Sequence, residues 1–221
     1  MIGLAHALGV YVVTSGGLVP GRTHLDVGLA AIEGGAGAVQ LRAPELEDTG
    51  ILPLAADLAV QCRARGVLFI VNDRLELALE GGADGVHLGP EDNPSGARRR
   101  LGRGRVLGVS VGTPAEARVA EEAGADYLGV TVWATPTKPD AVPHGLDGLQ
   151  AVVASTRLPV VGIGGVDASN ARLVLEAGAA GVAVVSAVGA APDPAGATRT
   201  LVETVRAHRT RRGAGPSVGR D

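Results

Sequence analysis

The amino-acid sequence predicts an α/β protein that folds as a single (β/α)8 barrel, a TIM barrel. Two observations carry this prediction: an internal repeat, and the alternation of strand-like and helical patterns along most of the 221 residues. A barrel of this kind routinely occupies this length as one domain. We therefore expect one catalytic barrel domain over residues 1–208. A disordered basic tail should follow over residues 209–221, where the apolar periodicity ends.

The repeat consists of four segments that begin with Gly-Ala and end on an apolar residue, each after an apolar helical pattern. Glycine at this position can take the left-handed conformation that ends a helix before the chain enters a strand. The four segments are 35–39, 82–86, 124–128 and 178–182.

Four other strand-like runs precede or separate these segments, at 10–14, 67–72, 106–110 and 159–164. Interleaving the two series gives eight strands, near residues 10, 38, 68, 85, 107, 128, 160 and 182. Strands that alternate with helices form a parallel sheet, and eight of them predict a closed barrel.

The helices follow from the amphipathic period of the remaining segments. We expect them at 26–33, 51–65, 74–80, 94–102, 114–122, 146–155, 169–176 and 196–208. The run Arg98-Arg99-Arg100 in the fourth of these is interpreted as a solvated helix face.

Composition narrows the classes of function. A net charge of −3 and a pI near 6.0 argue against nucleic-acid binding. The single cysteine, Cys62, rules out an intramolecular disulfide and fits a reducing compartment. The absence of a long apolar run and of a charged signal-peptide start predicts a cytoplasmic protein without membrane attachment.

Polar residues gather where the predicted strands end. In a (β/α)8 barrel the carboxyl ends of the strands form the face that carries the active site. The residues concerned are Gln40, Arg42, Asn72, Asp73, Asp92, Ser110, Gly165, Val185 and Ser186, with Lys138 in the loop after the sixth strand. A functional site at this end of the barrel is therefore predicted.

Lys138 is the only lysine of the chain and stands beside Thr135, Pro136 and Thr137. Lysine is a compact charge on a flexible stem, so it suits a phosphate group that moves during a reaction. Together with Arg42 it would bind a strongly charged phosphate.

Asp73 and Asp92 follow adjacent strands, so their carboxylates could share one hard cation. Mg²⁺ that also bridges substrate phosphates fits two protein carboxylates well. An alternative is that Asp73 simply caps the next helix and pairs with an arginine. The glycines around Gly165 and the backbone N–H groups near Ser186 follow strands seven and eight, where barrels often bind phosphate. Two phosphate sites and one metal imply a reaction between two phosphorylated small molecules.

Three other polar residues are interpreted more simply. His87 is taken as a packed histidine at a strand end, and His144 has no partner visible in the sequence. Ser110 lacks a nearby histidine–acid pair in the sequence, so hydrogen bonding to a ligand is favoured over a nucleophilic role.

The sequence resembles the thiamine-phosphate synthase family from Tyr11 to about His208. The resemblance rests on an ordered set of motifs, each at the expected strand end. These are Tyr11-Val12-Val13-Thr14, Val39-Gln40-Leu41-Arg42, Val71-Asn72-Asp73-Arg74, Glu91-Asp92, Gly108-Val109-Ser110, Thr135-Pro136-Thr137-Lys138, Ile163-Gly164-Gly165 and Val185-Ser186.

The resemblance implies a transferase that condenses 4-amino-5-hydroxymethyl-2-methylpyrimidine diphosphate with a thiazole phosphate, releasing diphosphate and forming thiamine phosphate. It implies loss of diphosphate before the new bond forms, with Mg²⁺ held by Asp73 and Asp92. Lys138, Arg42 and Ser110 would be the catalytic residues. The pyrimidine diphosphate would be bound by Gln40, Arg42, Asn72, Ser110 and Lys138, and the thiazole phosphate by Thr135, Pro136, Thr137, Gly165, Val185 and Ser186.

The chain departs from the family pattern at three places. Ala43-Pro44 replaces the usual Glu-Lys, Val130-Thr131 replaces Gly-Pro, and Gly112 stands where histidine is frequent. Two alternatives therefore stay open: a paralogue that binds thiamine-type ligands without synthesis, and the related thiazole tautomerase. A phosphosugar epimerase would want paired acids and metal-binding histidines at the strand ends, and these are not evident. A homo-oligomer is compatible with all of them.

Overall fold

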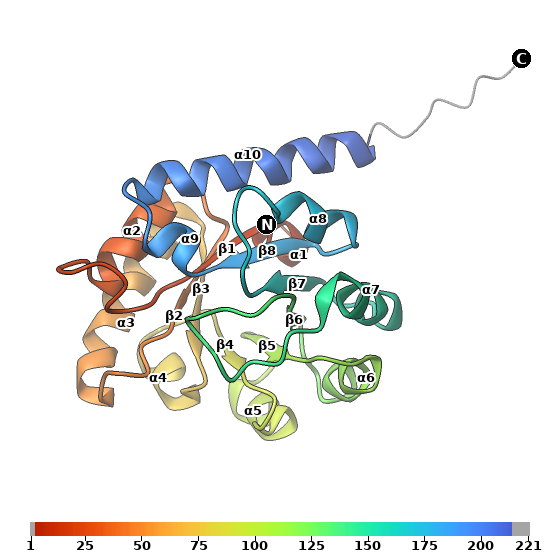
Figure 1. Ribbon diagram of the computed structural model, residues 1–221. Coiled ribbons are helices and arrows are strands. Elements are labelled where there is room, and N and C mark those ends of the chain that lie inside the picture. The colour runs from red at the N-terminus through yellow and green to blue at the C-terminus, as the bar shows by residue number, and fades with distance from the viewer. Residues whose placement is uncertain (1–2, 214–221) are drawn as a thin grey trace, which may run out of the picture.

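The computed structural model describes residues 3–213 and shows a closed barrel of eight parallel strands surrounded by helices (Figure 1). Each strand pairs with the next in the sequence, and β8 closes the barrel against β1. The strands are β1 Val10–Val13, β2 Ala38–Leu41, β3 Leu68–Asn72, β4 Gly85–Leu88, β5 Val106–Ser110, β6 Tyr127–Thr131, β7 Val160–Ile163 and β8 Gly181–Val184. The predicted fold class and all eight strands are confirmed.

The predicted helices are also present, with ends shifted by a few residues. They are α2 His24–Glu33, α3 Asp48–Arg65, α4 Leu75–Glu80, α5 Pro94–Leu101, α6 Pro114–Glu122, α7 Gly145–Ser155, α8 Ala171–Glu176 and α10 Pro194–Gly213. Two four-residue helices, α1 Leu4–Ala7 and α9 Ser186–Gly189, were not predicted, because so short a helix shows no amphipathic period.

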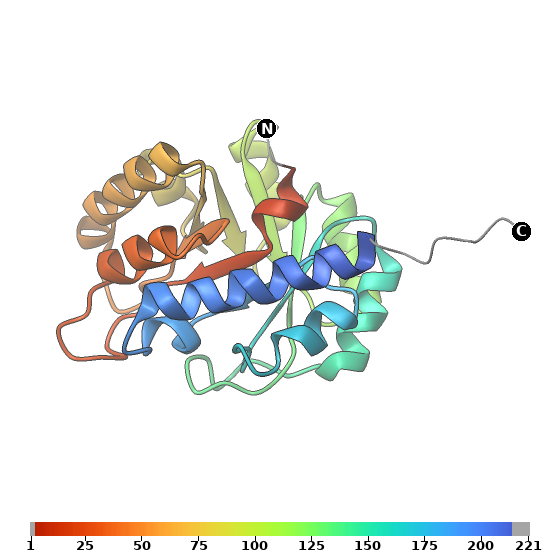
Figure 2. The ribbon, with the colours of Figure 1, turned by 90° about the horizontal axis from the view of Figure 1, so that it is seen from above.

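The boundary predicted at residue 208 is wrong, because α10 continues to Gly213. Arg209 explains the extra turn: its guanidinium donates to the carbonyl oxygens of Ala5 at 2.9 Å and Ala180 at 3.0 Å. These bonds tie the end of α10 to α1 and to the entry of β8. Figures 1 and 2 show α10 lying along the outside of the barrel, beside α2 and α8. The rest of the predicted tail, residues 214–221, lies outside the described residues.

The four repeated glycines end helices as predicted. Gly35, Gly82, Gly124 and Gly178 have φ values of 87°, 72°, 89° and 99°, the left-handed region that glycine enters at little cost. The alanine after each glycine donates its N–H back to the helix, as Ala83 does to the carbonyl of Ala78 at 3.0 Å. The repeat is therefore a repeated helix stop that returns the chain to the barrel.

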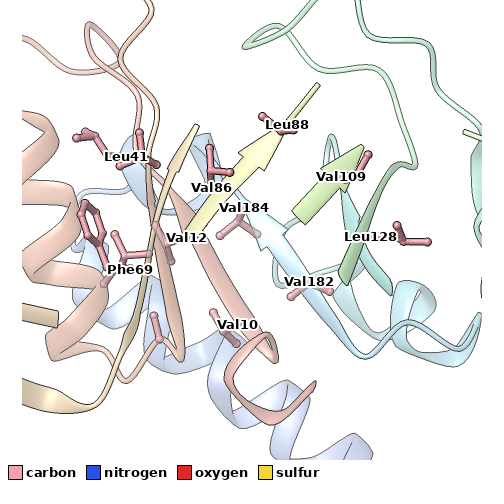
Figure 3. Packing of buried hydrophobic residues seen from close by; sticks show 14 of the residues in the cluster. Val10, Val12, Leu41, Phe69, Val86, Leu88, Val109, Leu128, Val182 and Val184 are labelled. Carbon is pink, nitrogen blue, oxygen red and sulfur yellow. The ribbon is translucent and has the colours of Figure 1, made fainter. Parts of the chain in front are cut away.

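Apolar residues fill two separate layers, because successive side chains of a strand point to opposite faces. The larger layer lies between the strands and the helices and contains Val12, Leu41, Phe69 and Leu128 (Figure 3). The smaller layer fills the inside of the barrel: Leu8, Tyr11, Val13, Ala38, Ile70, Tyr127, Val161 and Ala183. Leu8, which follows α1, is fully buried and belongs to this inner layer.

No helix within residues 3–213 combines the length and the apolar character needed to cross a bilayer.

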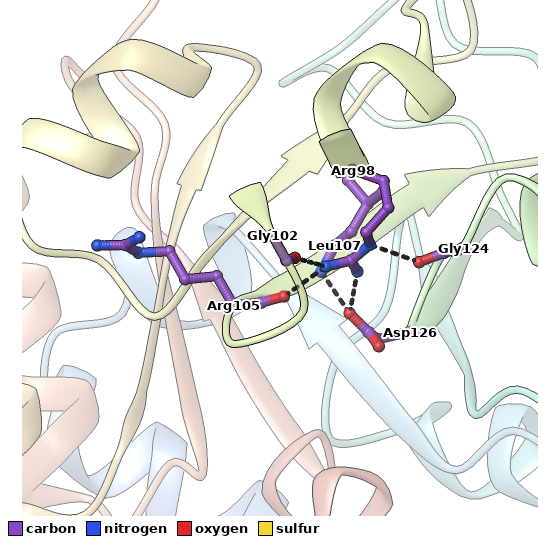
Figure 4. A network of polar contacts seen from close by, with 6 residues as sticks. All are labelled: Arg98, Gly102, Arg105, Leu107, Gly124 and Asp126. Carbon is purple, nitrogen blue, oxygen red and sulfur yellow. Dashed lines mark hydrogen bonds and ion pairs between the residues drawn. The ribbon is translucent and has the colours of Figure 1, made fainter. Parts of the chain in front are cut away.

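The interpretation of Arg98 as solvated is wrong. Its guanidinium lies between α5 and the start of β5 and β6, where it pairs with the carboxylate of Asp126 (Figure 4). It also donates to the carbonyl oxygens of Gly102 at 2.6 Å, Arg105 at 2.8 Å and Gly124 at 2.9 Å. Asp126 in turn accepts the N–H of Leu107 at 2.8 Å. The network fixes one end of two neighbouring strands.

We expect Arg98→Ala to lower the free energy of unfolding by roughly 1–3 kcal/mol, because it removes the donor to the partly buried carbonyl groups of Arg105 and Gly124 and the partner of the Asp126 carboxylate. Urea unfolding followed by circular dichroism measures the loss. Arg99→Ala is the matched control, since Arg99 is the exposed neighbour on the same helix. Equal losses in the two variants would contradict a structural role for Arg98.

Candidate functional site

A pocket opens at the carboxyl end of the barrel, the face predicted to carry the site. It is lined by side chains from the strands and by the loop that joins β6 to α7. Ten of the predicted site residues meet there: Gln40, Arg42, Asn72, Ser110, Thr135, Thr137, Lys138, Gly165, Val185 and Ser186. Residues from six segments of the chain thus converge on one cavity.

Three predicted residues lie outside the wall of this pocket. Pro136 belongs to the same loop but is exposed and does not line the cavity. Asp73 lines a smaller adjoining cavity, which it shares with Arg42, Asn72 and Arg74. Asp92 lies next to Asp73 at the rim.

Other pocket residues were not predicted, among them Tyr11, Tyr127, Thr131 and Ile163. They occupy strand positions whose side chains point into the barrel; Ile163 lies two residues before Gly165, and Thr131 is in register with Ile163. A period of two along each strand, counted back from the polar strand ends, would have identified them.

Asp73 and Asp92 form the acidic side of the site. A methyl group placed on Gly89 would lie 3.5 Å from Oδ2 of Asp92 and 3.9 Å from Oδ1 of Asp73, so the two carboxylates flank one point. The Gly89 N–H donates to Asp92 Oδ2 at 2.8 Å. Asp73 has φ of 59°, a left-handed conformation that few non-glycine residues adopt and that often marks a functional position.

The electrostatics around Asp73 favour a cation. Partial burial of its carboxylate raises the pKa of Asp73, and the negative charge of Asp92 raises it further, while Lys138 lowers it to a smaller degree. A hydrogen bond from Asn72 and the charge of Arg42 also lower it, but the pKa of Asp73 stays raised. Within the described residues no cluster of three or more His, Cys, Asp or Glu side chains forms a metal cage. Two carboxylates beside an open pocket suit Mg²⁺, which usually keeps waters and takes substrate phosphate oxygens as its other ligands.

The loop between β6 and α7 brings the positive charge. Backbone bonds from Val132 to the Ile163 carbonyl at 2.7 Å and from Trp133 to the Gly164 carbonyl at 3.3 Å hold its first residues beside β7. Beyond them, the hydroxyls of Thr135 and Thr137 lie 2.9 Å apart. Lys138 follows at the mouth of the pocket, within electrostatic range of both Asp73 and His87.

Gly164 and Gly165, which follow β7, form the wall of the pocket beside the start of the β6–α7 loop. Both have positive φ, 86° and 63°. A Cβ on Gly164 would lie 2.5 Å from the Trp133 carbonyl oxygen, so only glycine fits beside the β6–α7 loop. Val185 and Ser186, at the start of α9, line the same wall. The wall presents backbone and a hydroxyl rather than bulky side chains, which leaves room for a phosphate.

The floor of the pocket is a connected set of hydrogen bonds. Gln40 Nε2 lies 2.6 Å from the Tyr11 hydroxyl, which lies 2.9 Å from the Tyr127 hydroxyl. His87 Nδ1 lies 2.9 Å from Tyr127, and its Nε2 lies 3.0 Å from Ser110 Oγ. Interpreting His87 as only a packed residue was therefore incomplete, because its ring faces the pocket.

Burial and the nearby charge of Lys138 lower the pKa of His87 to about 4, so the imidazole is neutral near pH 7. Burial raises the pKa of both Tyr11 and Tyr127 well above the usual value. Gly108 provides the space for the Tyr127 ring, since a Cβ there would lie 2.1 Å from its Cζ. The floor is polar, uncharged and tightly packed.

The departures from the family pattern have visible consequences. A Cβ on Gly112 would lie 2.2 Å from the His144 ring, so that ring occupies the space of a side chain at position 112. Pro44 lines the adjoining cavity, where Arg42 and Arg74 supply the positive charge. The backbone of Arg42 is held in place by its amide N–H, which donates to Thr14 Oγ1 at 3.2 Å.

Comparison with known proteins places these features in context. The family described as thiamine monophosphate synthase matches residues 10–188. A thiamine-phosphate synthase of Moorella thermoacetica is 49% identical over 199 residues, which are 89% of this chain and 95% of that protein.

Two further proteins are similar over nearly the whole chain. A thiamine biosynthesis bifunctional protein of Symbiobacterium thermophilum is 47% identical over 92% of this chain, but the chain spans only 42% of that protein's length. The solved structure of a thiamine phosphate pyrophosphorylase from Pyrococcus furiosus is 38% identical and superposes with a TM-score of 0.85, covering 93% of this chain and 99% of that one.

Proposed function

The chain belongs to the thiamine monophosphate synthase family, and from that premise we propose that it joins 4-amino-5-hydroxymethyl-2-methylpyrimidine diphosphate to 4-methyl-5-(2-phosphoethyl)thiazole, carboxylated or not. The products would be thiamine phosphate and diphosphate. The chain is an enzyme, a transferase of thiamine biosynthesis. The substrates, the metal and the order of steps are the proposed part.

The observation that carries the proposal is the division of one pocket into two polar ends. One end has Arg42 and Lys138, and the Asp73–Asp92 pair lies just beyond it, beside the adjoining cavity; this arrangement suits a diphosphate with Mg²⁺. The other end has the backbone of Gly165 and the start of α9, which suits a less charged phosphate. Between them lie the inward residues of β6, β7 and β8, largely apolar, where two flat rings could stack.

The proposed mechanism needs little covalent chemistry from the protein. Bound Mg²⁺ would neutralise negative charge on the diphosphate as it leaves. Lys138 and Arg42 would stabilise the same developing charge, and binding both substrates in one pocket would bring the thiazole nitrogen to the pyrimidine methylene carbon. No general base is required, and the neutral His87 fits that requirement.

The two alternatives on the same fold have weaker support. A thiazole tautomerase would need a side chain at position 112, where glycine leaves its space to His144. A paralogue that only binds ligand is favoured by Pro44 alone.

The test is a discontinuous assay for thiamine phosphate from the two phosphorylated substrates, with Mg²⁺ and with chelator. We expect product only with Mg²⁺. Folded protein that makes no product at high substrate concentrations, yet binds thiamine phosphate, would instead establish the binding paralogue. Product formed equally well in chelator would contradict the role of Asp73 and Asp92.

A further inference from the structure

The hydrogen-bonded floor of the pocket joins side chains from five strands: Gln40 of β2, Tyr11 of β1, Tyr127 of β6, His87 of β4 and Ser110 of β5. Tyr11 and Tyr127 meet across the interior, with ring centres 6.0 Å apart and planes at 69°. We propose that this chain of bonds runs in one direction, from the Gln40 amide to the Ser110 hydroxyl, and thereby fixes Ser110 as a hydrogen-bond donor to bound diphosphate. The identity of that ligand rests on the proposed function.

The direction begins at Gln40, whose amide N–H donates to the Tyr11 oxygen at 2.6 Å. Tyr11 is 2% exposed, so its own proton must find an acceptor within the protein. The acceptor in contact with it is the Tyr127 oxygen, at 2.9 Å. In the reverse order Tyr11 would accept two bonds, and its proton would be buried without a partner.

Tyr127 is fully buried, and its proton in turn has His87 Nδ1 as its acceptor, at 2.9 Å. A neutral imidazole has one acceptor and one donor nitrogen, so accepting at Nδ1 places the ring proton on Nε2. Nε2–H then donates to Ser110 Oγ at 3.0 Å. Ser110 accepts this bond, which leaves its own proton free to point into the pocket that it lines.

The direction matters for the ligand. Diphosphate is an anion whose oxygens chiefly accept hydrogen bonds, so a serine that donated to His87 would turn lone pairs towards an anion. A serine that accepts from His87 presents its proton instead. The five hydrogen-bonded side chains carry no net charge. Lys138 therefore has no charged group among them that would compete with the ligand for it. His87 and the two tyrosines are positioning residues in this arrangement, since they act through Ser110.

The tautomer of His87 is the direct readout. In ligand-free protein labelled with ¹⁵N-histidine, two-bond ¹H–¹⁵N correlation spectra distinguish the two neutral forms. The signals of His87, one of five histidines, are assigned by their loss in His87→Gln. We expect a protonated Nε2 and an unprotonated Nδ1 from pH 6 to 8. A proton on Nδ1, or a doubly protonated ring, overturns the proposed direction.

Tyr127→Phe and Tyr11→Phe form a matched pair, because each removes one hydroxyl and keeps its ring. Tyr127→Phe deletes the bond to Nδ1, so His87 should lose its single tautomer and kcat should fall about tenfold. Tyr11→Phe leaves the Tyr127–His87 bond in place and should keep the tautomer. Loss of the tautomer preference in both variants, or in neither, overturns the proposal. If either variant fails to fold, the wild-type spectrum decides.

A conservative replacement separates direction from simple packing. In His87→Gln the amide can accept from Tyr127 and donate to Ser110, whereas His87→Leu can do neither. We expect His87→Gln to retain most of the kcat that His87→Leu loses, with smaller changes in KM. Equal kcat values in the two variants would show that His87 only fills space.

The ligand is tested separately with inorganic diphosphate and Mg²⁺ by calorimetry. Ser110→Ala should weaken binding by about tenfold. Unchanged affinity would overturn the assignment of diphosphate to Ser110. Because the tautomer is measured without substrate, a failure of the synthase proposal leaves that result intact, and the two failures are distinguishable.

Discussion

Lys138→Ala should lower kcat for thiamine phosphate formation by a factor of about 10²–10³, equivalent to roughly 3–4 kcal/mol of lost transition-state stabilisation. Lys138 lies on the β6–α7 loop, lines the pocket and is within electrostatic range of His87 and Asp73. Its ammonium group is exposed before the substrate binds, and it would stabilise the negative charge that develops on the diphosphate as it leaves. Because that charge is greatest in the transition state, the effect should be greater on kcat than on KM.

Steady-state kinetics with saturating Mg²⁺ measures this change. Arg118→Ala is the control, because it removes an equal charge from the exposed face of α6, outside the barrel. Lys138→Arg should recover only part of the activity, since a planar guanidinium follows a moving phosphate less well than an ammonium group. Turnover close to wild type in Lys138→Ala would eliminate the proposed role.

Asp73→Asn should abolish Mg²⁺-dependent turnover and at the same time raise the thermal stability of the metal-free protein at pH 7. The pKa of Asp73 is raised in the folded protein, first by burial and then by the charge of Asp92. Folding therefore works against the ionised carboxylate. The neutral amide removes that opposition and, with it, one of the two metal-binding carboxylates.

The pH dependence has a definite sign. A carboxyl whose pKa is raised on folding binds its proton more tightly in the folded state, so its contribution to stability is full below the ordinary pKa of 3.8 and is lost as pH rises through the folded value. The stabilisation of Asp73→Asn relative to wild type should accordingly be greatest at neutral pH and vanish at acid pH.

Thermal unfolding with and without Mg²⁺ provides the measurement. Added Mg²⁺ should raise the Tm of the wild type and leave that of Asp73→Asn unchanged. Asp57→Asn, an identical change on the exposed face of α3, should behave like wild type. A Tm for Asp73→Asn below that of wild type at pH 7 would show that the carboxylate stabilises the fold instead.

The barrel could be predicted from the sequence because its signals are local. Gly35, Gly82, Gly124 and Gly178 each stop a helix through their own backbone conformation, and that is written in a few adjacent residues. The C-terminal end of α10 and the environment of Arg98 could not be predicted, since both depend on contacts with other elements; Arg98, for example, reaches Gly124 and Asp126. Arg209 reaches Ala5 and Ala180, and such contacts leave no periodic signature.

The candidate site likewise contains residues that the sequence could predict and residues that it could not. Residues in recognisable motifs, such as Gln40 and Lys138, were found and lie in the pocket. Tyr11, Tyr127 and His87 were missed or underestimated because each lies inside a strand, where an apolar neighbourhood makes a polar ring look structural. Only the barrel's closure shows that β1, β4 and β6 direct these rings to a common centre.

The bonds of Arg209 place both ends of the described chain together, on the side of the barrel away from the pocket. α1 begins and α10 ends near the amino ends of the strands (Figure 2), whereas Lys138 and Gly165 line the pocket at the carboxyl ends. A second protein attached at either end would thus leave the route of substrates unobstructed. The barrel is therefore suited to fusion with a second protein; the bifunctional relative of Symbiobacterium thermophilum is more than twice as long as the region that matches this chain.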